Sequence, residues 1–334
     1  MKWYPWLRPD FEKLVASYQT GRGHHALLIQ ALPGMGDEAL IYALSRYLMC
    51  QQPEGHKSCG QCRGCQLMQA GTHPDYYVLQ PEKGKSTLGI DAVRDTSEKL
   101  YEHSRLGGAK VVWIADAALL TEAAANALLK TLEEPPKNTW FFLACEEPAR
   151  LLATLRSRCR AFHLAPPSEA YALAWLEREI SQPRETLLTA LRLCDHAPAA
   201  ALELLAPESW GAREKLCQAL SATLTSGDWL ALLPTLNHDS VVARLHWFSS
   251  LLLDALKHQQ RITRLTNADS LGLVHQLANT LSASRLQVIA ADACTCREQL
   301  LSVTGLNREL ILTERLLRWE QYLQPGVVLP VSHL

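Results

Sequence analysis

Residues 26–40, ALLIQALPGMGDEAL, have the strand, glycine turn and helix start of a phosphate-binding loop, but with reversed charge. Asp37 stands where the pattern G-x-x-x-x-G-K-[ST] needs the lysine that contacts the β- and γ-phosphates, and Glu38 replaces the hydroxyl residue that binds Mg²⁺. A carboxylate about 4 Å from a phosphate charge opposes binding by roughly 4 kcal/mol at an effective dielectric of about 20. The sequence therefore predicts a nucleotide-site scaffold that cannot hold a nucleotide. The loop positions concerned are Ala31, Gly34, Gly36, Asp37 and Glu38.

Asp37 and Glu38 also have a simpler interpretation, which we favour for their own role. They fall in the first turn of a predicted amphipathic helix, where the helix macrodipole stabilises negative charge. On this interpretation the two acids stabilise a helix terminus that no longer has a ligand.

A second nucleotide motif is expected at the end of the apolar run at residues 110–114. An active version ends in Asp-Glu, where the first acid holds Mg²⁺ and its neighbour orients the attacking water. Ala115 and Asp116 occupy these positions here. The magnesium-binding acid is therefore missing as well.

Four cysteines, Cys50, Cys59, Cys62 and Cys65, follow the spacing C-x8-C-x2-C-x2-C in a hydrophilic, glycine-containing stretch. Four thiolates at such intervals can close a tetrahedral zinc site, and they leave no open position for catalysis. Four unrelated free thiols are the alternative, which the repeated C-x2-C disfavours. The spacing predicts one structural zinc, with His56 and His73 nearby as ordinary surface residues.

The elements that must position these groups follow from length and pattern. Short apolar runs at residues 26–30, 76–79, 110–114, 139–144 and 160–164 alternate with helical patterns, which predicts a buried parallel sheet covered by helices on both faces. After Pro166-Pro167, Ser168 is a candidate N-cap, and only helical patterns follow. Near the start, Trp3, Tyr4 and Trp6 could form an interface patch or close a sheet edge, and we favour the second interpretation.

Composition describes an ordinary globular protein of 334 residues with two or three domains and a net charge of -1. That charge provides no general attraction to nucleic acid. No secretion signal or membrane-spanning stretch is predicted, which indicates a cytoplasmic location and no membrane partner. In that compartment, ten cysteines indicate metal binding or free thiols.

The run NALLKTLEEPP at residues 126–136, followed by Ser157-Arg158-Cys159, resembles bacterial clamp-loader subunits of the AAA+ class, and the resemblance extends over the whole chain. It implies an α/β AAA+ P-loop-type module with a parallel sheet and flanking helices, a small helical lid domain and an all-α C-terminal collar domain. The implied domains are residues 1–166, with the zinc-binding insert at 50–65, then 167–206 and 207–334.

Within that family, the combination of an altered phosphate loop and an intact Ser-Arg-Cys is similar to a non-hydrolysing subunit rather than to the ATP-hydrolysing gamma/tau subunit. Further departures point the same way. Cys145 and Glu146 stand at the family's polar sensor positions, and Ala199 takes the place of a lid-domain sensor arginine. The resemblance implies no ATP bound and no intrinsic ATPase, within a DNA-directed DNA polymerase holoenzyme.

Arg158 is the exception to these losses. On residue types alone it is a solvated arginine among Arg150, Arg156 and Arg160. The resemblance reverses this interpretation and implies an arginine finger that acts in trans on a neighbour's ATP, with Ser157 and Cys159 as supporting residues of the motif.

The resemblance further implies a stationary ring partner of the DNA polymerase III clamp loader, which places a sliding clamp on primed DNA in chromosomal replication. The implied partners are the gamma/tau and delta subunits, contacted through the collar, with clamp and primed DNA reached mainly through the complex. Two alternatives remain open: an active P-loop ATPase, which needs lysine at Asp37, and a zinc-ribbon nucleic-acid-binding protein, which needs more basic residues than Lys57 and Arg63.

Overall fold

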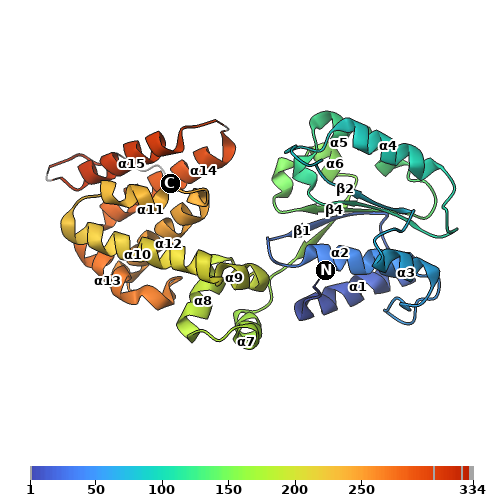
Figure 1. Ribbon diagram of the computed structural model, residues 1–334, viewed down its shortest axis with the longest axis horizontal. Coiled ribbons are helices and arrows are strands. Elements are labelled where there is room, and N and C mark those ends of the chain that lie inside the picture. The colour runs from blue at the N-terminus through green and yellow to red at the C-terminus, as the bar shows by residue number, and fades with distance from the viewer. Residues whose placement is uncertain (1, 304, 325, 331–334) are drawn as a thin grey trace. The chain divides into compact units, whose positions relative to one another are not determined.

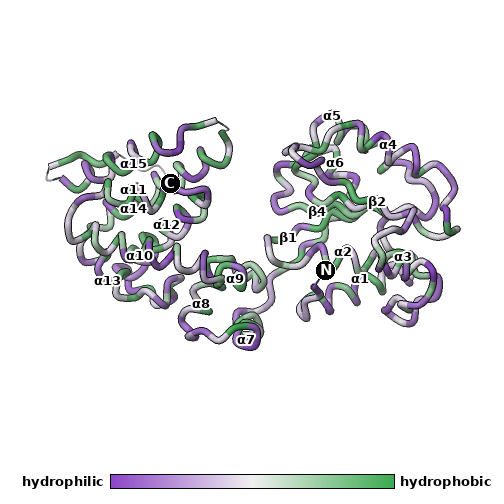
Figure 2. The backbone as a smooth tube through the Cα atoms, viewed as in Figure 1, coloured by the Kyte–Doolittle hydropathy of each residue, from purple (hydrophilic) through white to green (hydrophobic). Residues whose placement is uncertain are grey.

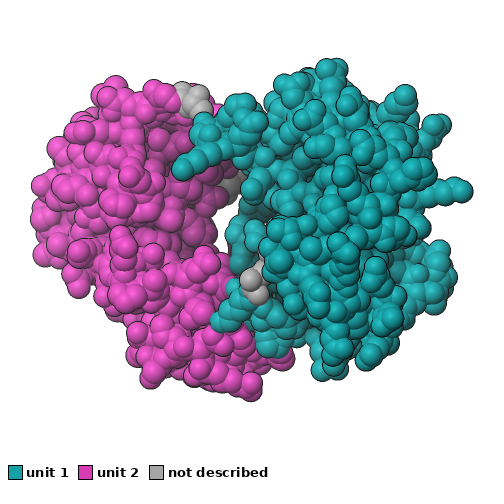
Figure 3. All heavy atoms as spheres, turned by 45° about the vertical axis from the view of Figure 1, so that its right-hand side comes forward, with its two compact units in different colours: residues 1–167 teal, residues 168–334 magenta. Residues whose placement is uncertain are grey.

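A five-stranded parallel sheet forms the centre of the first of two units, Met1–Pro167 and Ser168–Leu334 (Figure 3). This computed structural model describes residues 2–303, 305–324 and 326–330. The strands lie in the order β2-β3-β4-β1-β5, and every neighbouring pair is parallel. Their bounds are Ala26–Ala31 (β1), Tyr76–Leu79 (β2), Lys110–Ile114 (β3), Thr139–Cys145 (β4) and Arg160–Leu164 (β5). All five predicted strands and their parallel pairing are confirmed.

Burial differs between the centre and the edges of this sheet. Nearly every residue of β1, β3 and β4 is buried, because helices cover both faces, and the sheet is a mainly hydrophobic layer in Figure 2. In β5, however, Arg160, Ala161 and His163 are exposed, and Val78 of β2 is exposed. The prediction that every strand is fully buried is therefore wrong for β2 and β5, because each is an edge strand with a neighbour on one side only.

Helices flank the sheet on two sides, with α1 and α2 on one side and α4 and α5 on the other (Figure 1). Their apolar faces pack on the strands; Leu128 and Leu132 of α5, for example, share a buried cluster with Phe141 of β4. The helices of this unit are Arg8–Gln19 (α1), Asp37–Leu48 (α2), Arg63–Gln69 (α3), Ile90–Tyr101 (α4), Glu122–Glu133 (α5) and Ala153–Arg156 (α6).

In the second unit, all the regular secondary structure of the described residues is helical. It begins as predicted, because the Ser168 side chain accepts a hydrogen bond from the Tyr171 backbone N–H and caps α7. The helices are Glu169–Glu179 (α7), Arg184–Leu193 (α8), Pro198–Leu204 (α9), Pro207–Ser226 (α10), Leu233–Leu236 (α11), Val241–Gln259 (α12), Leu271–Thr280 (α13), Ala283–Ser302 (α14) and Arg308–Tyr322 (α15).

Three buried aromatic rings form the centre of this second core. Phe248 stacks on Trp319 at 5.1 Å between centroids, and Trp229 meets both rings edge-on. All three side chains are fully buried. Such edge-to-face and stacked contacts add to the apolar burial and fix how α12 and α15 pack.

A buried polar network joins α8 to the longer helices. Thr189 of α8 donates to Asp269 Oδ1 at 3.0 Å, and Arg213 of α10 donates to Asp269 Oδ2 at 2.6 Å and to Asn267 Oδ1 at 2.8 Å. Because the Arg213 side chain is only 1% exposed, its charge needs these acceptors. The network ties residues 168–206 to the rest of the second unit.

None of the helices that the structure describes is both long and apolar enough to cross a membrane.

The first prediction concerns Asp254 of α12, which is fully buried. Its carboxylate accepts hydrogen bonds from the backbone N–H groups of Thr266 and Asn267 at 3.0 and 2.7 Å. We expect Asp254→Ala to lower the free energy of unfolding by about 2–4 kcal/mol, because buried donors lose their acceptor. Urea unfolding followed by circular dichroism measures this.

Asp239→Ala is the matched control. Asp239 is 98% exposed and pairs with Arg308 at the surface, so its loss is expected to leave the free energy of unfolding almost unchanged. Equal effects from the two substitutions would contradict the role given to the buried carboxylate.

Candidate functional site

The altered phosphate loop lies between β1 and α2, at the carboxyl end of the central strand. Gly34 and Gly36 have φ of 79° and 84°, which is the left-handed region that glycine adopts without strain. Helix α2 begins at Asp37, directly after Gly36 as its N-cap, and Asp37 and Glu38 form its first turn. The loop therefore keeps its shape although two of its side chains have become acidic.

The electrostatics at Asp37 oppose anion binding. Burial raises the pKa of this carboxyl above its usual value, and the carboxylates of Glu38 and Asp116 raise it further, against hydrogen bonds from the backbone N–H groups of Asp37 and Glu38. Three acids from both nucleotide motifs thus act on one site. A phosphate entering here would meet the same repulsion.

The N-terminal segment lies over this loop. Trp6 Nε1 donates to the backbone oxygen of Met35 at 2.8 Å, and the Tyr4 ring stacks on Trp6 at 4.7 Å. A Cβ atom on Gly36 would fall 2.5 Å from Tyr4 Cδ2, so the ring rests directly on the glycine. The expectation that Tyr4 and Trp6 only close a sheet edge is therefore wrong. No local sequence pattern predicts this contact, because the two segments meet only in the folded chain.

The second motif is also reorganised. Ala115 and Asp116 follow the end of β3, as expected, but Asp116 Oδ1 accepts a hydrogen bond from the Ala118 backbone N–H at 2.9 Å. The carboxylate thereby caps the short 3-10 helix Ala117–Leu119. At the neighbouring strand end, Cys145 is buried and burial raises the pKa of its thiol, while Glu146 is exposed. Ala199 lies buried in α9 of the second unit.

Cys50, Cys59, Cys62 and Cys65 come together in one cluster. Their four Sγ atoms all lie within 4.8 Å of one another, with Cys50 Sγ 3.5 Å from Cys59 Sγ and 4.0 Å from Cys62 Sγ. A tetrahedral zinc with Zn–S bonds of about 2.3 Å requires sulfur atoms about 3.8 Å apart. The donor set therefore fits a four-thiolate metal ion, and none of the ten cysteines is in a disulfide.

The backbone around the cluster explains why it forms. Cys62 is the N-cap of α3 and accepts a hydrogen bond from the Cys65 N–H, so one turn of helix sets the C-x2-C spacing. Gly64 lies where a Cβ would come within 2.5 Å of the Met49 backbone oxygen. Gln19 of α1 donates to the Gly55 oxygen at 2.7 Å and anchors the insert.

The two nearby histidines are not part of this cluster. His56 is exposed, as expected, but His73 is only 7% exposed, and burial lowers its pKa. The prediction of a surface position is wrong for His73, whose Nδ1 accepts a hydrogen bond from the Asp75 backbone N–H at 3.2 Å.

Within the cysteine cluster, burial opposes ionisation of the Cys62 thiol. Hydrogen bonds from the Cys65 and Gln51 backbones and from neighbouring thiols nevertheless lower its pKa to about 6.

Arg158 lies at the amino ends of the parallel strands, whereas the phosphate loop lies at their carboxyl ends. It follows α6 and precedes β5, whose first residue, Arg160, is in register with Leu27 near the start of β1. The loop follows the other end of β1, where Ala31 is in register with Leu164. At about 3.3 Å per residue, the two ends of β5 are roughly 13 Å apart. Arg158 therefore cannot serve the loop of its own subunit.

The Arg158 guanidinium is held on its own surface. Nε donates to Glu133 Oε1 at 2.6 Å, Nη2 donates to the same oxygen, and Nη1 donates to the Thr154 backbone oxygen at 2.8 Å. Ser157 Oγ also donates to the Thr154 oxygen, at 3.0 Å, and stabilises the turn. Burial raises the pKa of the Cys159 thiol to about 12, which makes it a packing residue.

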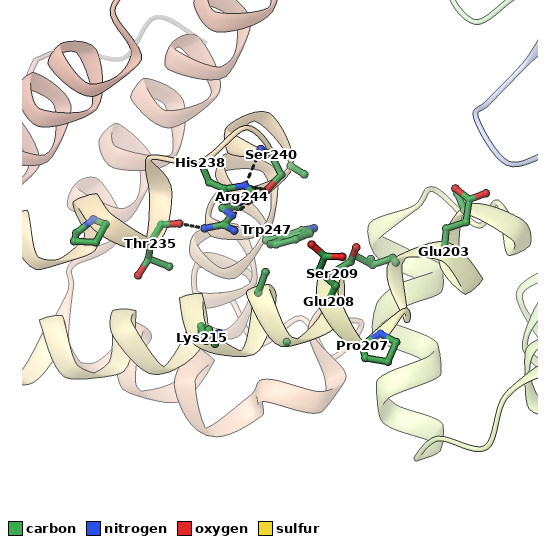
Figure 4. Close-up of a pocket in the computed structure, with 16 residues that line it drawn as sticks. Glu203, Pro207, Glu208, Ser209, Lys215, Thr235, His238, Ser240, Arg244 and Trp247 are labelled. Carbon is green, nitrogen blue, oxygen red and sulfur yellow. Dashed lines mark hydrogen bonds between the residues drawn. The ribbon is translucent and has the colours of Figure 1, made fainter.

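The second unit also contains a cavity of about 820 Å³ that sequence reasoning did not predict (Figure 4). Its wall carries charges of both signs, Glu203 and Glu208 with Lys215 and Arg244. The Arg244 guanidinium donates to Ser240 Oγ at 3.0 Å and to the Thr235 backbone oxygen, and burial lowers its pKa. The loop, the cysteine cluster and Arg158 all belong to the first unit, so this cavity is not part of them.

Family models match almost the whole chain in three consecutive segments. Residues 8–168 match the DNA polymerase III delta subunit model, and residues 207–321 match the model of the C-terminal part of a DNA polymerase III delta subunit. Between them, residues 167–206 match the AAA+ ATPase lid domain of DNA polymerase III subunit delta'. The fold class expected from the sequence is thereby confirmed.

Curated relatives agree over the full length. DNA polymerase III subunit delta' of Escherichia coli (strain K12) is 70% identical over 334 residues, covering 100% of both chains. The Yersinia pestis subunit delta' is 55% identical, covering 98% of each chain. DNA polymerase III subunit tau of Escherichia coli is 28% identical, over 79% of this chain and 41% of tau. This chain therefore belongs to the delta' subunit family of the DNA polymerase III clamp loader.

Proposed function

We propose that this subunit acts as a stationary, non-hydrolysing member of the clamp-loader ring and donates Arg158 as an arginine finger to a neighbour's ATP site. The observation that carries this proposal is the position of Arg158 before the amino end of β5, away from its own phosphate loop at the carboxyl end of β1. A guanidinium aimed at a γ-phosphate stabilises charge that grows in the transition state, an effect of about 10³–10⁵ in rate for GTPases. The subunit thus contributes to hydrolysis only within the polymerase holoenzyme, during clamp loading on primed DNA.

Three features of the structure support the proposal that this chain binds no ATP. Asp37 and Glu38 replace the phosphate ligands, Asp116 caps a local turn, and the Tyr4 ring rests on Gly36. Each feature removes a different requirement of a nucleotide site: charge, metal binding and access. Their combination supports a subunit without intrinsic ATPase.

We place the partners at the collar, residues 207–334, in a three-domain chain with a module at 1–166 and a lid at 167–206. The limits of the matched family models support these boundaries. Leu301, Leu310 and Leu317 on α14 and α15 are 58%, 66% and 44% exposed, and such apolar side chains are suited to burial by another subunit. The gamma/tau and delta subunits are the proposed partners, and sliding clamp and primed DNA are reached mainly through the complex.

For the four-cysteine insert at residues 50–65 we propose one structural zinc ion. The sulfur separations fit a tetrahedral site, and none of residues 51–63 is buried. A loop without buried residues of its own gains its order from the metal. With four thiolates the coordination shell is closed, so zinc has no catalytic role here.

The zinc proposal predicts one zinc per chain in protein purified under reducing conditions, measured by elemental analysis. Cys62→Ser should reduce the zinc content to well below one ion per chain, while the near-ultraviolet circular dichroism signal and the sheet remain. Cys294→Ser is the control, since Cys294 lies in α14 outside the cluster. Protein that contains no zinc, or equal zinc in both variants, would contradict the assignment.

A further prediction is that the isolated chain shows no saturable binding of trinitrophenyl-ATP and no hydrolysis with Mg²⁺. Asp37→Lys alone should not restore turnover, because Glu38 and Ala115 leave Mg²⁺ without its ligands. Substantial turnover by this single variant would show that the loop is an active ATPase site with one altered residue.

The finger assignment predicts that Arg158→Ala leaves folding, zinc content and ring assembly intact but lowers DNA- and clamp-stimulated ATP hydrolysis in a complex whose ATPase subunits are wild type. The loss is partial if sites act independently, because this chain touches one ATP site. Arg158→Lys should rescue poorly, since an ammonium cannot reproduce the two-pronged contact of a guanidinium with phosphate oxygens.

Arg156→Ala is the matched control for the finger. Arg156 is exposed and ends α6, two residues before Arg158. If both substitutions act alike, or if Arg158→Ala complexes load clamps at the wild-type rate, only a scaffold role remains.

A further inference from the structure

Glu133 binds the side chain of Arg158, the proposed arginine finger. It is the last residue of α5, and its Oε1 accepts hydrogen bonds from both Nε and Nη2 of Arg158, while Thr154 accepts one from Nη1. Three of the five N–H groups of the guanidinium are therefore engaged within the subunit. These include the Nε–Nη2 edge, which otherwise gives the paired contact with phosphate oxygens.

This ion pair is strong enough to bias Arg158 and weak enough to open. The side chains of Arg158 and Glu133 are 30% and 48% exposed. Exposed ion pairs contribute up to about 1 kcal/mol, which corresponds to about a fivefold preference for the closed arrangement. A triphosphate carries more negative charge than one carboxylate, so it can take over the guanidinium when a neighbour presents it at close range.

We propose that Glu133 is a positioning residue that stores Arg158 against its own subunit and releases it to the neighbour's nucleotide. This inference rests on the proposed finger role of Arg158. While Arg158 is paired with Glu133, it cannot contact the neighbour's phosphate. The apparent affinity of Arg158 for that phosphate therefore falls in proportion to the fraction of Arg158 that is unpaired. The pair thereby suppresses ATP hydrolysis in complexes in which the neighbouring subunit does not yet hold its nucleotide close to Arg158.

In the alternative arrangement, Glu133 stays bound to Arg158 and orients it toward the phosphate. This arrangement predicts the opposite effect of removing Glu133 on the rate of ATP hydrolysis. Keeping a carboxylate beside the guanidinium would offset the charge that the γ-phosphate needs and would place two anions close together. Removing Glu133 would then lower the rate instead of raising it.

The test uses the reconstituted clamp loader without DNA or clamp, carrying Glu133→Gln, Arg158→Ala, both, or neither. The measured quantity is the Arg158-dependent rate, the difference in ATP hydrolysis between each complex and its Arg158→Ala counterpart, which removes the contribution of sites this chain does not touch. We expect Glu133→Gln to raise this rate about two- to fivefold. Glu134→Gln, at the exposed next residue, should leave it unchanged.

A measurement on the full isolated chain reads the ion pair directly. With ¹⁵N-labelled arginine, the Arg158 Nε–H should exchange slowly with solvent in the wild type and in Glu134→Gln, and faster in Glu133→Gln. Rapid exchange in the wild type would overturn the stored position.

The two proposals fail in different ways. If Arg158→Ala lowers hydrolysis but Glu133→Gln leaves the Arg158-dependent rate unchanged or lowers it, the finger stands and the storage role of Glu133 is wrong. If Arg158→Ala has no effect on hydrolysis in the fully stimulated complex, the finger role is wrong and the inference about Glu133 falls with it.

Discussion

The parallel pairing of β1 with β5 is the constraint on which the rest of this subunit depends. It aligns the end of β1 that enters the phosphate loop with Leu164, and the start of β1 with Arg160. The loop and Arg158 are thereby fixed at opposite ends of these two adjacent strands. On the function proposed above, this arrangement would let the strand end that carries Arg158 in one subunit face the phosphate loop of its neighbour in the ring.

A phosphate loop that loses its ligand must still satisfy the groups that bound it. The N-terminus of α2 carries free backbone N–H groups and a partial positive charge. Asp37 and Glu38 provide negative charge at that terminus from within the chain, and the Tyr4 ring covers the glycine that a phosphate would approach. The two acidic residues therefore stabilise the N-terminus of α2 and oppose the approach of a phosphate. Retaining the scaffold maintains the sheet geometry that positions Arg158.

The helical second unit has a different physical basis. Its cores are held by buried rings such as Trp229 and Trp319, and its parts are joined by the buried charges of Arg213 and Asp269. Buried ion pairs of this kind add little net stability but penalise alternative arrangements, because separating them leaves a charge without a partner.

The sequence by itself determined the five strands, the helical second unit and the motifs, because hydrophobic period, caps and residue spacing are local properties of the chain. It also identified the four cysteines, since their C-x2-C repeats require only one turn of helix to converge. It could not place the edge strands, whose exposure depends on neighbours in the sheet, or His73, whose burial depends on the fold around it. Only the tertiary structure brought Tyr4 onto Gly36 and Glu133 onto Arg158. These contacts join residues 25 or more positions apart, and no local pattern records which distant side chains a folded chain will bring together.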